Sequence, residues 1–225
     1  MYWPDCPFPV ALITESKRPV IANVRPLCLG AGLDWSTLLL CALDVVRTPY
    51  VLFTLEDFFL RQQVCTPRIT ALFDDFKQES LHMLRLTPRP GPTIDLKNME
   101  YGGFEPGAPY KVSTQVAFWN VETLRQLLVS GETAWEFEVN ASVRSAELAG
   151  FFAVWRDAIP YRHHVVERGK WFPWDYWKFS QMNIGVDLAA RPVMTVGETS
   201  KWIIGKILSK LVRRVPMRLR RVLLS

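Results

Sequence analysis

The sequence predicts an α/β fold in which a mixed, mainly parallel sheet is flanked by helices. Residues 8–14 form a nearly continuous apolar run, which is typical of a strand covered on both faces. Residues 34–46 place apolar side chains at helical spacing, and residues 50–55 are rich in β-branched and aromatic side chains. Strand, helix and strand in this order predict a βαβ unit with parallel strands and a right-handed crossover.

Local signals place further elements along the chain. Asp34 or Ser36 can cap the first helix by accepting from its free backbone N–H groups. Pro67 is typical of a first helical residue and predicts a helix over residues 67–85. A strand is predicted at 110–114, with helices at 121–128 and 135–148; the proline- and glycine-rich residues 87–109 predict a long irregular loop.

The positive charge of the chain belongs to its C-terminal tail. The whole chain carries a formal charge of +5, whereas residues 199–225 contain eight Lys or Arg and no Asp or Glu, so residues 1–198 carry −3. A basic nucleic-acid-binding surface on the body is therefore not expected. We expect one domain over residues 1–198, followed by a basic amphipathic tail over 199–225.

The tail has the pattern of a helix that lies on a membrane. Apolar side chains from Ile203 to Val215 fill one half of a helical wheel, and Lys206, Lys210 and Arg213 lie on the other half. The alternative is a helix packed on the body with solvated charges. Cationic excess without any acid favours an anionic lipid surface as the partner of residues 201–221. Scattered cysteines, the lack of a secretory signal and the lack of an 18-residue apolar run predict a cytoplasmic protein, peripheral at the inner face of the plasma membrane.

Two adjacent acids follow the strand at 50–55. Ligand sites of open parallel sheets lie beyond the carboxyl ends of the strands, where Glu56 and Asp57 are expected. Carboxylate oxygens suit a hard cation such as Mg²⁺ or Mn²⁺, which would neutralise a diphosphate leaving group. Asp57 is the better candidate to face the ligand. The alternative is that both acids only cap the following turn.

A second acidic motif, with the sequence W-E-F-E, covers residues 135–138. On a strand, both carboxylates would lie on one side and both rings on the other. A carboxylate among aromatic rings has the raised pKa of a general base, and Glu136 and Glu138 are therefore candidate bases. The alternative is a helix start whose first-turn acids interact with the helix dipole.

Several of these motifs together resemble a known family. The stretch D-W-S-T-L-L-L-C-A-L-D-V-V-R-T-P-Y-V-L-F-T-L-E-D-F-F-L (34–60) is similar to the core of bacterial GT-A-type, family 2-like glycosyltransferases of surface-polysaccharide synthesis. The resemblance extends to residues 110–128 and 135–138, and to Y-W-P-D-C-P (2–7) and R-G-K-W (168–171). It implies a GT-A-like fold and transfer of a sugar from a nucleotide-sugar donor to a glycan or lipid-linked acceptor.

The resemblance also implies roles for individual residues. Glu56 and Asp57 would contact the metal and the donor phosphates. Ser113, Gln115 and Trp119 would lie near the acceptor, and Glu136 or Glu138 would act as base. Independently of the resemblance, Arg168 and Lys170 are candidates to clamp the donor diphosphate, the alternative being a solvated turn around Gly169, and Asp34 is a further candidate donor-binding residue.

The chain departs from the family pattern in two ways. Its acidic pair is E-D and not D-x-D, and the first strand and helix of the family, which shape the nucleobase pocket, are expected to be missing before Met1. Two rival functions stay open: a catalytically inactive remnant that binds a partner in polysaccharide assembly, and a metal-dependent phosphate or nucleotide hydrolase that uses the same acids.

Overall fold

The computed structural model describes residues 2–97, 99–162, 165–182 and 187–214, with side chains up to residue 207 in the last range. The chain divides into two compact units, residues 1–161 and 162–225. This division falls earlier in the chain than the boundary at residue 198 that charge suggests. The last part of the predicted tail, residues 215–225, lies outside the described residues.

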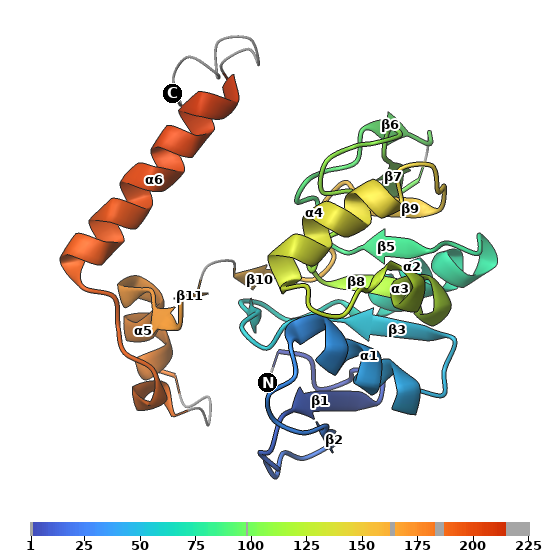
Figure 1. Ribbon diagram of the computed structural model, residues 1–225. Coiled ribbons are helices and arrows are strands. Elements are labelled where there is room, and N and C mark those ends of the chain that lie inside the picture. Colours follow the sequence, from blue (N-terminus) through green and yellow to red (C-terminus); the bar gives the residue numbers. More distant parts are fainter. Residues whose placement is uncertain (1, 98, 163–164, 183–186, 215–225) are drawn as a thin grey trace. The chain divides into compact units, whose positions relative to one another are not determined.

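A mixed sheet organises the first unit (Figure 1). In the described part of the chain it has six strands in the order β3-β8-β5-β9-β7-β6. Their bounds are β3 Tyr50–Phe53, β8 Ala117–Asn120, β5 Met83–Arg85, β9 Phe151–Val154, β7 Tyr101–Gly103 and β6 Ile94–Asp95. Among these described pairings only β5 and β9 are parallel neighbours; the other four neighbouring pairs are antiparallel. The prediction of a mainly parallel sheet is therefore wrong, although the α/β class is confirmed.

The first two strands form a sheet of their own. β1 (Val10–Thr14) pairs in parallel with β2 (Val24–Cys28), from Val10 opposite Val24 to Thr14 opposite Cys28. Residues 15–23 join them. β3 lies in the six-stranded sheet, so the predicted βαβ unit of adjacent strands is not formed by the described pairings. Correct prediction of the individual elements did not predict their neighbours, because apolar runs do not specify a pairing partner.

Four helices of the first unit begin close to their predicted positions, but the helix predicted over residues 67–85 ends at Gln78, and Met83–Arg85 form the strand β5 instead. α1 (Trp35–Val45) begins after the N-cap Asp34, and α2 (Thr66–Gln78) has Pro67 in its first turn. α3 (Val121–Leu127) is capped by Asn120, whose side chain accepts from the backbone N–H of Thr123. α4 (Ala134–Arg144) begins with a capping box.

Two predictions in the middle of the chain need correction. Residues 110–114 form turns and bends, and the strand predicted there begins only at Ala117. The stretch predicted as an irregular loop supplies β6 and β7, which extend the sheet at one edge. Gly102 permits this, because a Cβ atom at that position would lie 2.4 Å from the carbonyl oxygen of Ile94.

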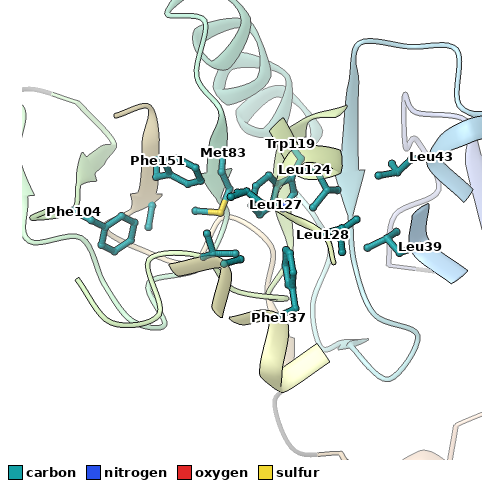
Figure 2. Packing of buried hydrophobic residues seen from close by; sticks show 14 residues of the cluster. Leu39, Leu43, Met83, Phe104, Trp119, Leu124, Leu127, Leu128, Phe137 and Phe151 are labelled. Atoms are coloured by element: carbon teal, nitrogen blue, oxygen red, sulfur yellow. The ribbon is translucent and has the colours of Figure 1, made fainter. Parts of the chain in front are cut away.

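Alternation along the strands divides the core into two clusters, one on each face of the sheet. Met83 and Trp119 belong to one cluster and their neighbours Leu84 and Phe118 to the other. The first cluster, shown in Figure 2, receives side chains from α1, α3 and α4, including Phe137. The second packs against α2. Burial of large apolar side chains on both faces is the main stabilising contribution to this unit.

The second unit consists of short strands and helices. β10 (Tyr161–Arg162) begins at the boundary between the units. β11 (Val166–Glu167) pairs with β12 (Lys170–Trp171) across a tight turn. The remaining short strand, β4 (Phe59–Leu60), belongs to the first unit. They are followed by α5 (Pro173–Ser180), a 3₁₀ turn at Leu188–Ala190 and α6 (Val196–Arg214). None of the described helices combines the length and apolar character that a bilayer span requires.

Candidate active site

Four strands have their termini at the same end of the six-stranded sheet. β3 and β5 are both antiparallel to β8, and β9 is parallel to β5, so β3, β5 and β9 share one direction. Ala117, the first residue of β8, lies opposite both Phe53 and Arg85, the last residues of β3 and β5. Two segments therefore lie at this end of the sheet: the segment after β3, with Glu56 and Asp57, and the segment before β8, with Ser113 and Gln115.

The acidic pair lies in a turn that begins three residues after the end of β3. Glu56 is exposed, whereas Asp57 is half-buried and its Oδ1 atom is shielded from solvent. The next residue, Phe58, stacks on the ring of Tyr161 with centroids 4.4 Å apart and planes 12° apart. This stacking holds the turn at this end of the sheet. Glu56 is the more accessible of the two acids.

Tyr161 connects the acidic turn to the segment before β8. Its hydroxyl donates to Oε1 of Gln115, and burial raises the pKa of Tyr161, so the phenol is protonated and able to donate at neutral pH. The backbone N–H of Gln115 in turn donates to Oγ of Ser113, at 3.2 Å. Gln115 is thus positioned from two sides.

Glu138 is held by the same segment. Its Oε1 atom accepts from Ser113 Oγ at 3.0 Å, from the backbone N of Thr114 at 2.7 Å and from Thr114 Oγ1 at 2.8 Å. Within the described part of the chain, Oε2 of Glu138 accepts no hydrogen bond. One oxygen therefore fixes the half-buried carboxylate, and the other is left to accept a proton.

Glu136 has a different task. It is the third residue of α4, and its Oε2 accepts from the backbone N (2.9 Å) and Oγ1 (2.8 Å) of Thr133 in the capping box. These bonds lower the pKa of Glu136, mainly through the backbone N–H of Thr133, in contrast to the raised value that we expected. On a helix, Glu136 and Glu138 lie about 200° apart. The helix-start alternative is thus confirmed, and Glu136 is a capping residue.

Two other predicted site residues serve the fold. Trp119 is 1% exposed and packs in the first core cluster beside Phe151, so the prediction that it contacts an acceptor is wrong. Asp34 caps α1 through Thr37 and also accepts from the backbone N of Gly131 at 3.0 Å. The hydrogen bond from the Thr37 side chain is the main reason why the pKa of Asp34 falls to about 2.

Arg168 and Lys170, the two predicted phosphate-binding residues, belong to the second unit. Arg168 lies in the turn between β11 and β12 with a positive φ of 51°. Lys170 forms an ion pair with Glu198 at the start of α6. This pair joins two elements of the second unit, which gives Lys170 a structural role there.

The sequence analysis did not identify two buried cationic side chains near the site, Arg85 and Lys111. Arg85, at the end of β5, is 0% exposed and donates to the carbonyls of Pro90 (3.3 Å), Tyr110 (3.1 Å) and Lys111 (2.9 Å). Burial lowers the pKa of Arg85 to about 10, opposed by the negative charge of Glu138. Lys111 donates to the carbonyls of Ser145, Ala146 (3.3 Å) and Leu148 (3.1 Å) beyond the end of α4. The sequence around Lys111 predicted a strand, and nothing in it indicated that Lys111 would be buried against the end of a helix.

These two cations fix the chain that carries the Glu138 ligands. Arg85 anchors the carbonyls just before Val112, and Lys111 joins the same stretch to the C-terminal end of α4. Glu138, on α4, is therefore held near Ser113 and Thr114 by contacts on both sides. A charge that neutralises helix-end carbonyls is favourable there because of the helix dipole.

The acidic pair is suited to a metal ion only in part. Among the described residues, no group of three or more His, Cys, Asp or Glu side chains lies close enough to form a metal site. Mg²⁺ and Mn²⁺ in nucleotide-dependent enzymes are commonly held by one or two carboxylates together with substrate phosphates. Asp57 and Glu56 fit a site of this kind, in which two carboxylates bind the metal ion and the phosphates of the donor supply the other ligands.

No known protein family, curated protein or solved structure matched the chain in comparisons with known proteins.

Proposed function

We propose that the first unit is a glycosyltransferase that moves a sugar from a nucleotide-sugar donor to a hydroxyl of a glycan or lipid-linked acceptor. One observation carries this proposal: Glu138, whose Oε2 accepts no hydrogen bond from the described residues, is connected to the acidic turn at Asp57 through Ser113, Gln115 and Tyr161. The resemblance to GT-A-type enzymes of surface-polysaccharide synthesis supports the same assignment.

Glu138 acts as the base in this proposal. Oε2 takes the proton of the acceptor hydroxyl while the hydroxyl oxygen forms a bond to the anomeric carbon of the donor sugar. The bond between that carbon and the diphosphate oxygen breaks, and the nucleoside diphosphate leaves with the bonding electrons. Oε1 keeps the carboxylate oriented through its three hydrogen bonds, which is the positioning that a direct displacement needs.

The leaving diphosphate is assigned to the acidic turn. Asp57 and Glu56 would hold Mg²⁺ or Mn²⁺, which supplies positive charge for the diphosphate oxygens. The stacking of Phe58 on Tyr161 keeps this turn in one position. A positioned carboxylate binds a cation better than one on a mobile loop, because less conformational entropy is lost.

Gln115 and Ser113 are assigned to the acceptor side. Gln115 uses Oε1 to accept from Tyr161, which leaves its amide nitrogen to donate to a sugar hydroxyl. Ser113 Oγ donates to Glu138 and accepts from the backbone N of Gln115, so it fixes the positions of these two residues relative to each other. We place the activity in the cytoplasm, at the inner face of the plasma membrane, where a lipid-linked acceptor would be presented.

A panel of nucleotide sugars tests the proposal. The purified protein is heated with each donor, with and without Mn²⁺, and then assayed for release of nucleoside diphosphate and for labelled sugar on an extracted lipid or glycan fraction. We expect one class of donor to raise the Tm and to give sugar transfer. Release of free phosphate without transfer would instead identify a hydrolase, and stabilisation by no donor would favour an inactive binding protein.

A further inference from the structure

The helix α6 contacts the rest of the second unit through one side. Trp202 packs edge-on against Phe172 with centroids 5.3 Å apart, and Lys206 lies over the Trp202 ring at 5.1 Å. At the start of the helix, Glu198 pairs with Lys170 and caps the helix through Thr195, whose backbone N donates to it at 2.8 Å. These contacts define the side of α6 that faces the unit.

A different side of α6 is apolar and open. Ile203, Ile204 and Ile207 are 43%, 55% and 53% exposed. At about 100° per residue, all three lie about 100° or more around the helix from Trp202. The isoleucines are thus not the residues by which α6 packs on its own unit, and the predicted packed-helix alternative does not explain them.

A second exposed apolar feature lies on α5. This helix buries Asp175 and Phe179, whereas Trp174 and Trp177 are 62% and 57% exposed and pack against each other with centroids 5.3 Å apart. Tryptophan is the side chain most typical of the boundary between lipid tails and water, because its ring is apolar and its N–H is polar. Two exposed tryptophans in one helix turn are costly in water unless a partner covers them.

Charge identifies the chemistry of that partner. Residues 199–225 carry eight basic and no acidic side chains, while residues 1–198 are net acidic. The sequence of this basic segment includes the open isoleucines. Together with the exposed tryptophans of the same unit, it complements a surface that is anionic on the outside and apolar below, which describes a bilayer with acidic lipids. Nucleic acid would match the positive charge, but it has no apolar surface on which the isoleucines could be buried.

We propose that the second unit docks on an anionic membrane surface, with Ile203, Ile204 and Ile207 of α6 and Trp174 and Trp177 of α5 entering the headgroup region. The inference goes beyond the transferase activity and does not require it. A peripheral module of this kind would hold any acceptor-modifying activity of the first unit at the bilayer.

Sedimentation of the full chain with vesicles tests this proposal. Vesicles of phosphatidylcholine alone are compared with vesicles that also contain phosphatidylglycerol. We expect binding to the anionic vesicles and at least about tenfold weaker binding to the neutral ones, with a further loss as salt is raised. Equal binding to both, or to neither, would overturn the proposal.

Matched variants separate insertion from charge. Ile203→Asp/Ile207→Asp is expected to reduce binding to anionic vesicles at least about tenfold, because two apolar side chains no longer enter the lipid. Val139→Asp/Val143→Asp makes the same kind of change at two exposed positions four residues apart on α4, and should leave binding unchanged. Unaltered binding by the isoleucine variant would overturn the proposal.

The tryptophans and a competing ligand give independent readouts. Trp174→Ala/Trp177→Ala should weaken vesicle binding without lowering the Tm, because both rings are largely exposed and contribute little to the core. A duplex DNA oligonucleotide should bind weakly and be insensitive to Ile203→Asp/Ile207→Asp. Tighter binding to DNA than to anionic vesicles at the same salt would assign the basic segment to nucleic acid and overturn the membrane proposal.

Discussion

Thr114 holds Glu138 by two hydrogen bonds to the same carboxylate oxygen, 2.7 Å from its backbone N and 2.8 Å from its Oγ1. Ser113 adds a third bond at 3.0 Å. The arrangement fixes the carboxylate without using its second oxygen. It therefore separates the position of Glu138 from its capacity to take a proton, and the two can be changed independently.

Thr114→Val removes one of the three positioning bonds and keeps the side-chain shape. We expect turnover to fall between about 10- and 100-fold with little change in donor KM, because the base is less well oriented. Thr123→Val is the matched control, since Thr123 is also buried and its Oγ1 is bonded to Nδ1 of His82 at 2.7 Å. Both variants should lose about 1 kcal/mol of stability, but only Thr114→Val should lose turnover. Equal kinetic effects would contradict the assignment.

Asp57→Asn should weaken binding of a nucleoside diphosphate in the presence of Mn²⁺. Loss of one carboxylate charge from the turn removes attraction for the cation, and we expect an affinity loss on the order of tenfold or more. Isothermal titration with UDP and with GDP, each with and without Mn²⁺, measures this. Asp74→Asn, an exposed acid on α2 that pairs with Lys77 at 2.9 Å, is the control. Retention of Mn²⁺-dependent binding by Asp57→Asn would argue against the acidic turn as the diphosphate site.

Arg85→Met should destabilise the first unit by about 2–4 kcal/mol. The methionine fills most of the space, but three buried carbonyls at Pro90, Tyr110 and Lys111 lose their donor. Urea unfolding followed by circular dichroism gives the free energy of unfolding. Arg156→Met, at an exposed arginine, should have little effect. An unchanged midpoint for Arg85→Met would show that the buried guanidinium is not what holds residues 110–111.

Asp34 predicts a specific change of stability with pH. Its folded pKa of about 2 lies below the ordinary 3.8, so the folded state favours the charged form. The resulting stabilisation is complete above the unfolded pKa and is lost as the pH falls through the folded value, in a window from about 4 to 2. Asp34→Asn keeps an N-cap oxygen but not the charge. The Tm difference between wild type and Asp34→Asn should therefore shrink as the pH is lowered through this window; a constant difference would contradict the cause given for the shift.

Local structure was predictable where a single residue has a strong conformational preference. Asp34 marks the start of α1, Pro67 the start of α2, and the apolar run from Tyr50 marks β3. These signals act within a few residues of the chain, so the sequence contains them in full. The basic tail was likewise predicted as a helix, and α6 extends over Val196–Arg214.

The sheet order was not predictable, because it depends on contacts between distant segments. Short buried strands such as Met83–Arg85 and Phe151–Val154 have no alternating pattern that would fix direction or partner. The W-E-F-E motif is ambiguous for a related reason: the capping bonds between Thr133 and Glu136 show that the motif belongs to the beginning of a helix, and the sequence alone does not. Buried Arg85 could not be distinguished from a surface arginine without knowing which carbonyls surround it.

A single-turnover transfer assay tests the central claim most directly. Wild type, Glu138→Gln and Glu136→Gln are each mixed in excess with a labelled nucleotide sugar that stabilises the protein, together with the acceptor fraction, and the first-order rate of sugar transfer is measured. We expect Glu138→Gln to bind the donor normally and to transfer at least about 100-fold more slowly, because amide nitrogen and oxygen cannot take the proton. Glu136→Gln should transfer at close to the wild-type rate. Equal rates for Glu138→Gln and wild type, or a larger loss for Glu136→Gln, would contradict the account.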